Sequence, residues 1–222
     1  MCFSPEVDLV AGITIAAIGV DTVRQVELPR QRAIAALPLI FGIHQISESF
    51  VWWELDGRIA APIGGLFTVV YLALAFGLLP WFVPWATRRL ELDPTRRAAM
   101  AALVVVGASV SAILMWAVLA SPVAVVDGGH YLSYRPQLTM GGYLAAAYVV
   151  TTCGALLLSS DHYLVLFGAV NLVAVSVLAV LLMSGVISLW CAWAAVTSAS
   201  ILWYLRRTNQ LQPRLEPIGT LT

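Results

Sequence analysis

The sequence predicts an all-α, polytopic membrane protein: a helical bundle of seven transmembrane helices with its N-terminus outside and its C-terminus inside. Three observations predict this fold class: the composition, the spacing of the apolar runs and the distribution of arginine. Of the 222 residues, 60% are hydrophobic and 11% are charged, and the mean hydropathy is +0.88. Because a soluble domain carries about 25% charged residues, this composition indicates an integral membrane protein.

Seven apolar runs approach the length that one membrane crossing needs, which is about 20 helical residues. In chain order, the predicted spans are residues 8–23, 33–54, 62–86, 98–120, 139–158, 163–185 and 187–205. The first run is short and the last two nearly touch, so six spans are the alternative. Residues 1–207 are therefore predicted to form one transmembrane domain, and residues 208–222 a polar cytoplasmic tail that is disordered.

Capping and breaking residues mark the ends of these runs. Asp93 followed by Pro94 is typical of an N-cap and a first helical position. Ser160 or Asp161 is expected to cap the sixth span in the same way. Prolines within or beside the spans are expected to kink or end helices: Pro38, Pro62, Pro80 and Pro84.

Arginine is distributed unevenly between the two predicted sides of the membrane. Only Arg58 and Arg135 fall on the side of the N-terminus, and the other ten of the twelve basic residues fall on the opposite side. The positive-inside rule therefore places the N-terminus outside, with the lipid bilayer as the partner. The absence of lysine excludes a retinal Schiff base, and the zero net charge gives no reason to expect a nucleic-acid partner.

The second predicted span carries polar side chains in the stretch FGIHQISESFVWWEL. His44 and Glu48 lie one helical turn apart, and Trp52 continues the same stripe. A charge at the centre of a membrane helix costs about 2.5–3.5 kcal/mol even on lenient scales. We therefore expect this face of the helix to point into the bundle rather than toward lipid.

The predicted topology brings other chemically distinctive side chains to the outer half of the bundle. Cys2 precedes the first span, Tyr143 lies one turn into the fifth, and Cys191 lies one turn into the last. Together they predict one outward-facing polar cluster, which consists of Cys2, His44, Glu48, Trp52, Tyr143 and Cys191.

The chemistry of this cluster has several interpretations. Cys2, His44, Glu48 and Cys191 would suit a transition metal such as zinc, copper or iron, and His44 could be an axial ligand of haem. His44 and Glu48 could instead handle protons as a coupled pair, or a protonated Glu48 could hold helices together by hydrogen bonds. Cys2 and Cys191 could also form a disulfide, because the outer side is oxidising.

Three segments carry a family resemblance: MCFS at the N-terminus, HQISESFVWWEL in the second span and SLWCAWAA in the last. With the pattern HQxxExxxW, the chain resembles a family of uncharacterised bacterial multi-pass membrane proteins that is defined by a domain of unknown function. The resemblance implies a bacterial cytoplasmic membrane protein and no mechanism. The seven-helix zinc amidases of the ceramidase and adiponectin-receptor group differ, because they bind zinc through three histidines and this last span has none.

Three functions follow as hypotheses. The first is a receptor-like or structural membrane protein, or an accessory subunit that contacts other membrane proteins. The second is a metal- or haem-dependent enzyme or redox protein that uses the polar cluster. The third is a proton-coupled transporter that uses His44 and Glu48, although paired helix breaks typical of transporters are absent from the sequence.

Overall fold

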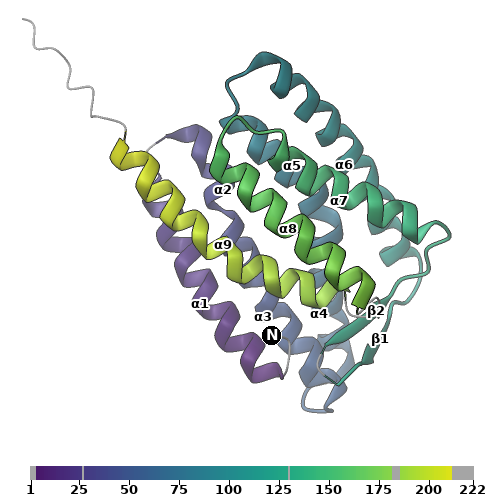
Figure 1. Ribbon diagram of the computed structural model, residues 1–222. Helices are drawn as coiled ribbons and strands as arrows, with labels where there is room; N and C mark the ends of the chain where they lie inside the picture. The colour runs from purple at the N-terminus through teal and green to yellow at the C-terminus, as the bar shows by residue number, and fades with distance from the viewer. Residues whose placement is uncertain (1–3, 27, 130, 182–185, 212–222) are drawn as a thin grey trace, which may run out of the picture.

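The computed structural model of the chain describes residues 4–26, 28–129, 131–181 and 186–211, and it is almost entirely helical (Figure 1). The elements are, in order, α1 (Pro5–Arg24), the 3-10 turn η1 (Pro29–Gln31), α2 (Arg32–Ala35), α3 (Leu37–Leu55), α4 (Ala61–Leu72), the π-helix η2 (Ala73–Leu78), α5 (Leu79–Leu90), α6 (Pro94–Ala120), β1 (Ala124–Asp127), β2 (Leu132–Arg135), α7 (Gly141–Leu157), α8 (His162–Leu181) and α9 (Val186–Leu211).

Each predicted span contains a helix or a broken helix, so the all-α fold class is confirmed. Five segments of the described chain are long and apolar enough to cross a membrane, and α7 is a shorter apolar helix. The five segments are Pro29–Leu55, Ala61–Leu90, Pro94–Ala120, His162–Leu181 and Ser188–Arg207. The count of seven crossings and their orientation remain predictions.

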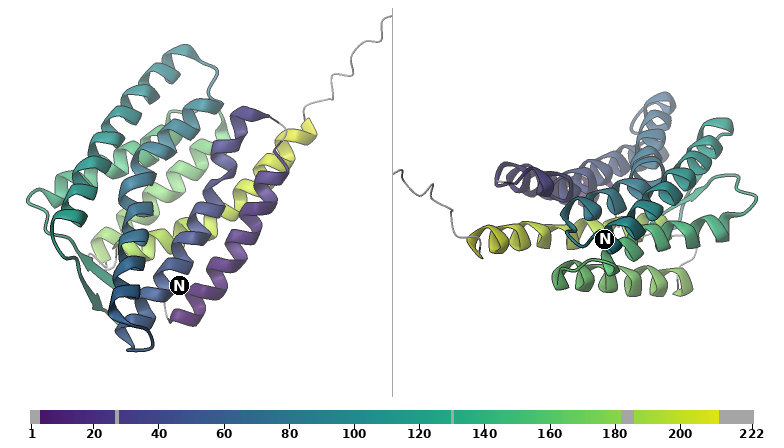
Figure 2. Two further views of the ribbon diagram at one scale, coloured as in Figure 1. Left: turned by 180° about the vertical axis from the view of Figure 1, so that it is seen from behind. Right: turned by 90° about the horizontal axis from the view of Figure 1, so that it is seen from above.

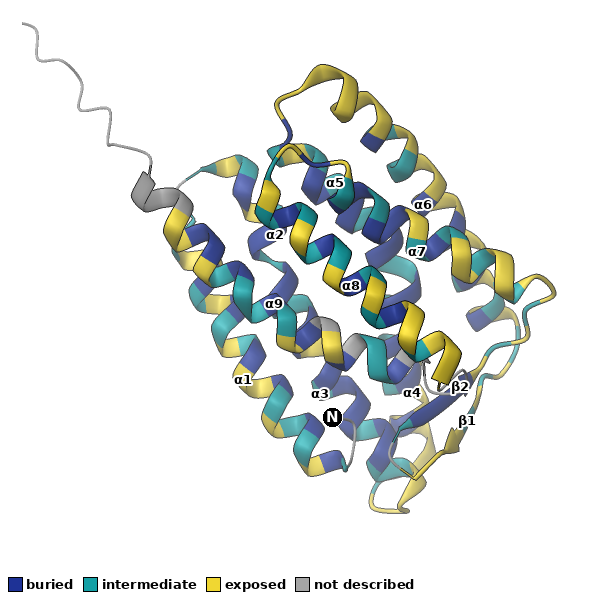
Figure 3. Cartoon of the chain, in the orientation of Figure 1, coloured by how far each residue is buried: buried dark blue, intermediate teal, exposed yellow. Residues whose placement is uncertain are grey.

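The apolar faces of α6 and α8 point outward. Val105, Leu119, Val173 and Val180 are all more than 60% exposed, and Figure 3 shows exposed positions along the outer sides of both helices. Helix α8 lies on the outside of the bundle, where it packs on α7 and α9 (Figure 2). Side chains of this kind are suited to contact with lipid, which fits a membrane-embedded bundle.

Two predicted N-caps are present in the structure. The backbone N–H of Arg96 donates to Asp93 Oδ1 at 2.8 Å, which starts α6. The N–H of Tyr163 donates to Asp161 Oδ1 at 2.8 Å, which starts α8. Helix α9 continues to Leu211, and the remainder of the predicted tail lies outside the described residues.

Helices α1 and α3 form a close antiparallel pair. A Cβ on Gly19 would overlap the backbone of Leu39, and one on Gly42 would overlap the backbone of Ala16. Only glycine permits this approach, as is common between membrane helices. Helix α9 crosses both members of the pair, so α3 is enclosed by α1, α4 and α9.

A short antiparallel hairpin covers one end of the bundle, and the sequence-based prediction did not include it. Strand β1 pairs with β2 from Ala124 opposite Arg135 to Asp127 opposite Leu132. Gly129 has a φ of +85°, which favours glycine, and its N–H donates to Asp127 Oδ1 at 2.6 Å. We call this end of the molecule the hairpin end. The opposite end, which carries Arg88, Arg89, Arg96 and Arg97, is the arginine-rich end.

Candidate functional site

The polar face of α3 points into the bundle, as the sequence predicted. His44 and Glu48 are 0% exposed and Trp52 is 5% exposed. Ser47 and Ser49 on the same helix are also buried, but their hydroxyls donate to the carbonyls of Ile43 and Gln45 one turn earlier. The serines are therefore satisfied within α3, whereas the ring of His44 contacts another helix.

The imidazole of His44 lies in an aromatic stack that reaches the hairpin. Its ring centroid is 3.8 Å from that of Tyr71 on α4, at an interplanar angle of 37°. Tyr71 stacks in turn on Tyr134 of β2, with centroids 4.6 Å apart and an angle of 17°. Three elements distant in sequence are thus joined by one stack, His44–Tyr71–Tyr134.

Neither ring nitrogen of His44 has a hydrogen-bond partner among the described residues. The side chain of Gln45 approaches the ring without reaching hydrogen-bond geometry. A buried polar group without a partner costs about 1–3 kcal/mol. The ring is held by stacking on Tyr71, and its nitrogens are buried without a hydrogen-bond partner among these residues.

Asp8 adds a second buried carboxylate at the depth of Glu48. Gly19 lies against Leu39 and Gly12 lies against Ile46, so one further turn of α1 brings Asp8 level with the turn of α3 that holds Glu48. Asp8 is 0% exposed. Asp8 lies in the first turn of α1, at a helix end, and nothing in the sequence led us to expect its complete burial. We call Asp8, His44, Gln45 and Glu48 the polar core.

The other predicted cluster residues have different outcomes. Tyr143, on the first turn of α7, is 79% exposed, and the structure does not bring it to the polar core. Cys2 lies outside the described residues, and so does the side chain of Cys191 on α9. Ser188, one turn before Cys191, is fully buried at the same end.

The described side chains do not form a metal centre. Nowhere in that part of the chain do three His, Cys, Asp or Glu residues gather closely enough to hold an ion. Of the four predicted ligands, His44 and Glu48 are described and cannot form such a group by themselves. The complete set of Cys2, His44, Glu48 and Cys191 thus stays a prediction.

A pocket of about 490 Å³ opens beside the stack, between the hairpin and helices α7, α8 and α9. Tyr134 belongs both to its wall and to the aromatic stack. Most of the wall is apolar, and the polar groups on it include Arg135, Tyr148 and Trp190. We call this cavity the hairpin pocket. Its volume lies within the range of small-molecule sites, about 300–1,000 Å³.

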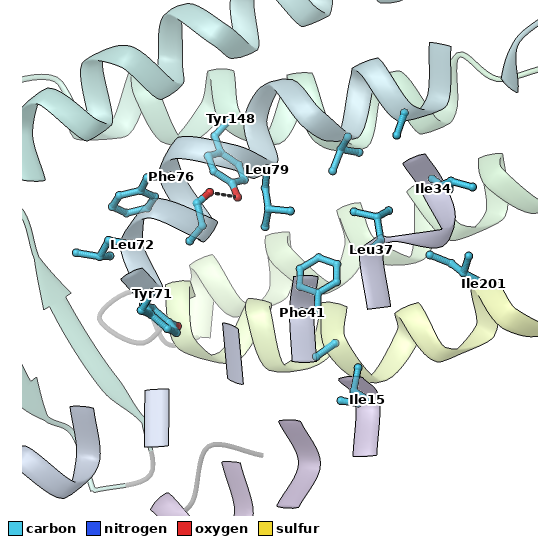
Figure 4. Packing of buried hydrophobic residues seen from close by; sticks show 14 of the residues in the cluster. Ile15, Ile34, Leu37, Phe41, Tyr71, Leu72, Phe76, Leu79, Tyr148 and Ile201 are labelled. Atoms are coloured by element: carbon cyan, nitrogen blue, oxygen red, sulfur yellow. Dashed lines mark hydrogen bonds between the residues drawn. The ribbon is translucent and has the colours of Figure 1, made fainter. Parts of the chain in front are cut away.

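The floor of the hairpin pocket is a π-helix. Ala75 and Phe76 of η2 line the pocket, and Pro80 follows shortly after, where it supplies no N–H to the preceding turn. Tyr148 Oη donates to the carbonyl of Ala75 at 2.8 Å, as Figure 4 shows. Such π-helical turns occur frequently at functional sites, and here the turn directs a carbonyl toward α7.

Sequence reasoning missed Tyr71, Tyr134 and the pocket. Tyr71 sits in an ordinary apolar run, and its role depends on a partner 63 positions later in the chain. The one available signal was the segment LSYR after a Gly-Gly pair, which is typical of a hairpin strand. A two-stranded hairpin between long apolar helices is too short for that pattern to stand out.

Comparison with known proteins adds a family and no activity. No curated protein and no solved structure matches the chain at a significant level. The family of unknown function DUF6629 matches residues 1–215, which is nearly the whole sequence. The chain therefore belongs to the family of unknown function DUF6629.

Proposed function

We propose that the chain is a receptor-like protein of the bacterial cytoplasmic membrane that binds a small anionic amphiphile in the hairpin pocket. It crosses the membrane seven times, with the hairpin end outside. The observation that carries the proposal is the double role of Tyr134, which lines the pocket and also ends the stack that begins at His44. A ligand that moves Tyr134 would change the surroundings of His44.

The lining of the pocket selects the ligand class. Apolar side chains from α7 and α8 fit a hydrocarbon body, and Arg135, the cationic residue of the wall, fits an acidic head group. Arg135 is exposed at the end of β2, so the head would lie near the hairpin and the chain would extend between the helices. A long-chain carboxylate such as oleate has this chemistry.

Quenching of tryptophan fluorescence tests the proposal. Trp190 lines the pocket and packs edge-on against Tyr148, with ring centroids 5.2 Å apart. Dibromostearate added to protein in nanodiscs should quench Trp190, and Trp190→Phe should remove that component. Ala145→Phe should block quenching because Ala145 lines the pocket, whereas Ala146→Phe, exposed on the same helix and outside the pocket, should not. Equal quenching in both variants would contradict the proposal.

The second candidate is a metal- or haem-dependent enzyme or redox protein. It is favoured by the ring nitrogens of His44, which have no hydrogen-bond partner among the described residues, and it requires Cys2 and Cys191 to approach His44 and Glu48. Elemental analysis and an absorption spectrum of wild type beside His44→Ala decide it. A stoichiometric metal or a haem band that the variant loses would replace the receptor proposal.

A proton-coupled transporter would use the same His44–Glu48 pair. Glu48→Gln would then abolish transport while the fold stays intact. The same substitution should be nearly harmless if Glu48 only joins helices, because a protonated glutamate and a glutamine have nearly the same shape.

A further inference from the structure

A second cavity, of about 50 Å³, lies in the middle of the bundle between α3, α5, α7, α8 and α9. Its wall includes Phe41, Leu79 and Cys153, and we call it the core cavity. Two residues of its wall, Tyr148 and Trp190, also line the hairpin pocket. The two cavities therefore adjoin each other, and these two aromatic side chains separate them.

The two cavities follow the same faces of α7 and α8, which pack on each other. On α8, the lining residues recur at every fourth position, from Phe167 in the core cavity to Ala179 in the hairpin pocket. Residues four positions apart lie on one face of a helix. On α7, the lining residues run from Gly141 in the hairpin pocket to Leu156 in the core cavity. The cavities thus lie end to end along this helix pair.

The length of the two cavities together suits a long hydrocarbon chain. The hairpin pocket follows α7 from Gly141 to Val149, which is about 12 Å of helix axis at the usual rise per residue. An acyl chain of a membrane lipid spans half of the hydrocarbon core, or about 15 Å. With the core cavity, the lined part of α7 extends to Leu156 and measures about 22 Å. The hairpin pocket alone is too short for such a chain, and the two cavities together are long enough.

The core cavity is suited to the end of that chain. Its polar side chains are satisfied within their own helices: Thr152 Oγ1 donates to the carbonyl of Tyr148 at 2.9 Å, and Asn171 Nδ2 donates to the carbonyl of Phe167 at 2.8 Å. The volume is about a third of the roughly 150 Å³ of an engineered apolar cavity that holds benzene. The core cavity therefore fits a narrow methyl end better than a ring.

The two side chains that separate the cavities are held differently. The hydrogen bond from Tyr148 Oη to the carbonyl of Ala75 fixes the tyrosine ring to η2 (Figure 4). Trp190 packs edge-on against Tyr148, and its Nε1 has no hydrogen-bond partner among the described residues. Because Trp190 has no such bond to lose, it is the side chain that can turn aside at lower cost.

We propose that the hairpin pocket and the core cavity are two chambers of one site for a long, unbranched acyl chain, with Trp190 as the gate between them. This two-chamber site rests on the proposed function of the hairpin pocket and adds the length of the ligand. The carboxylate lies at Arg135, and the methyl end passes Trp190 and reaches Cys153. A chain too short to pass Trp190 gains nothing from the core cavity.

Competition between fatty acids of different length tests the proposal. Palmitate or decanoate displaces dibromostearate from protein in nanodiscs, and the recovery of Trp190 fluorescence gives the affinity of each acid. Cys153→Leu puts a bulkier side chain into the core cavity and should weaken palmitate binding about tenfold, the worth of about two buried methylene groups. Decanoate binding should stay unchanged. Comparing the same acid between variants cancels its partition into lipid.

Val150→Leu is the matched control, because Val150 is exposed on the same helix and lines neither cavity. It should leave both affinities unchanged, and the melting temperature of each variant shows that it is folded. Palmitate with a diazirine at its methyl end gives a second measurement, which needs no variant. After illumination of wild type, mass spectrometry should find the label on the core-cavity residues of α7, which are Thr152, Cys153 and Leu156.

The outcomes separate the two-chamber site from the function on which it rests. If dibromostearate does not quench Trp190, the hairpin pocket is not a fatty-acid site and both proposals fail. If quenching occurs and Ala145→Phe removes it, the hairpin pocket stands. The two-chamber site is then overturned if Cys153→Leu weakens both acids equally or neither, or if the label is confined to residues of the hairpin pocket.

Discussion

Two buried ionisable side chains toward opposite ends of this bundle, Glu91 and His44, differ in how they are hydrogen-bonded. At the arginine-rich end, Glu91 is 3% exposed and accepts four hydrogen bonds from two neighbouring turns. In the half toward the hairpin, His44 is fully buried and its ring nitrogens have no partner in the described chain. The difference teaches that burial alone does not identify a functional site. A satisfied buried group braces the fold, whereas one left without partners lowers stability and needs another explanation.

The largest expected loss of stability follows from removing the Glu91 carboxylate. Glu91→Ala leaves three backbone N–H groups and a hydroxyl without their acceptor and should destabilise the protein by about 2–4 kcal/mol. Thermal unfolding in detergent measures this. Glu6→Ala is the control, because its 2.6 Å ion pair with Arg58 is exposed to solvent and should contribute little to stability. Equal effects of the two substitutions would remove the contrast between the ends.

The next effect concerns the helix pair that supports the polar core. Gly42→Ala would push a methyl group into the backbone of Ala16 and should cost about 1–3 kcal/mol. Gly65→Ala places its methyl group in open space and should leave stability unchanged or slightly higher. Thermal unfolding of both variants separates the packing of α1 on α3 from any role of the polar core. A harmless Gly42→Ala would mean that the two helices are not held this closely.

Acid should weaken the arginine-rich end selectively. Burial opposes ionisation of Glu91, but the hydrogen bonds from Ser160, Asp93 and Leu92 outweigh it and hold the pKa of this carboxyl below its usual range. Its contribution to stability is therefore complete above about pH 4.3 and is lost as the pH falls through the folded-state pKa. Glu91→Gln should flatten the dependence of melting temperature on pH below that value. If the melting temperature of Glu91→Gln falls in acid as steeply as that of wild type, other groups control the pH dependence.

The smallest effect should have the opposite sign. His44→Phe keeps an aromatic ring stacked on Tyr71 but removes two buried nitrogens. Stability should stay constant or rise by up to about 1 kcal/mol, as is common where a site has been kept for function. Thermal unfolding of the variant beside His44→Ala measures it, since His44→Ala also leaves a cavity and should destabilise. A clear loss of stability in His44→Phe would mean that the imidazole braces the fold.

Much of this architecture was predictable, because helices long and apolar enough to cross a membrane appear in the sequence as long apolar runs, and their ends carry caps such as Asp93 and Asp161. The burial of His44 and Glu48 was predictable from their place in such a run, since polar groups are costly in lipid. The partners of His44 were not, because Tyr71 and Tyr134 meet only after the hairpin folds onto the bundle. The burial of Asp8 was missed because its position in the first turn of a helix is typical of an exposed carboxylate. The π-helix was not predicted as such, because Pro80 indicates an irregular helix but not the kind of irregularity.

The central claim is that the hairpin pocket and His44 are coupled through Tyr134 and Tyr71. The most direct measurement is the imidazole NMR spectrum of histidine-labelled protein in nanodiscs, with and without oleate, and with His44→Phe to assign the signal among the three histidines. Oleate should shift the His44 resonance in wild type and leave it unshifted in Ala145→Phe. A His44 signal that stays unchanged while the ligand quenches Trp190 would contradict the account and leave the polar core as a structural element.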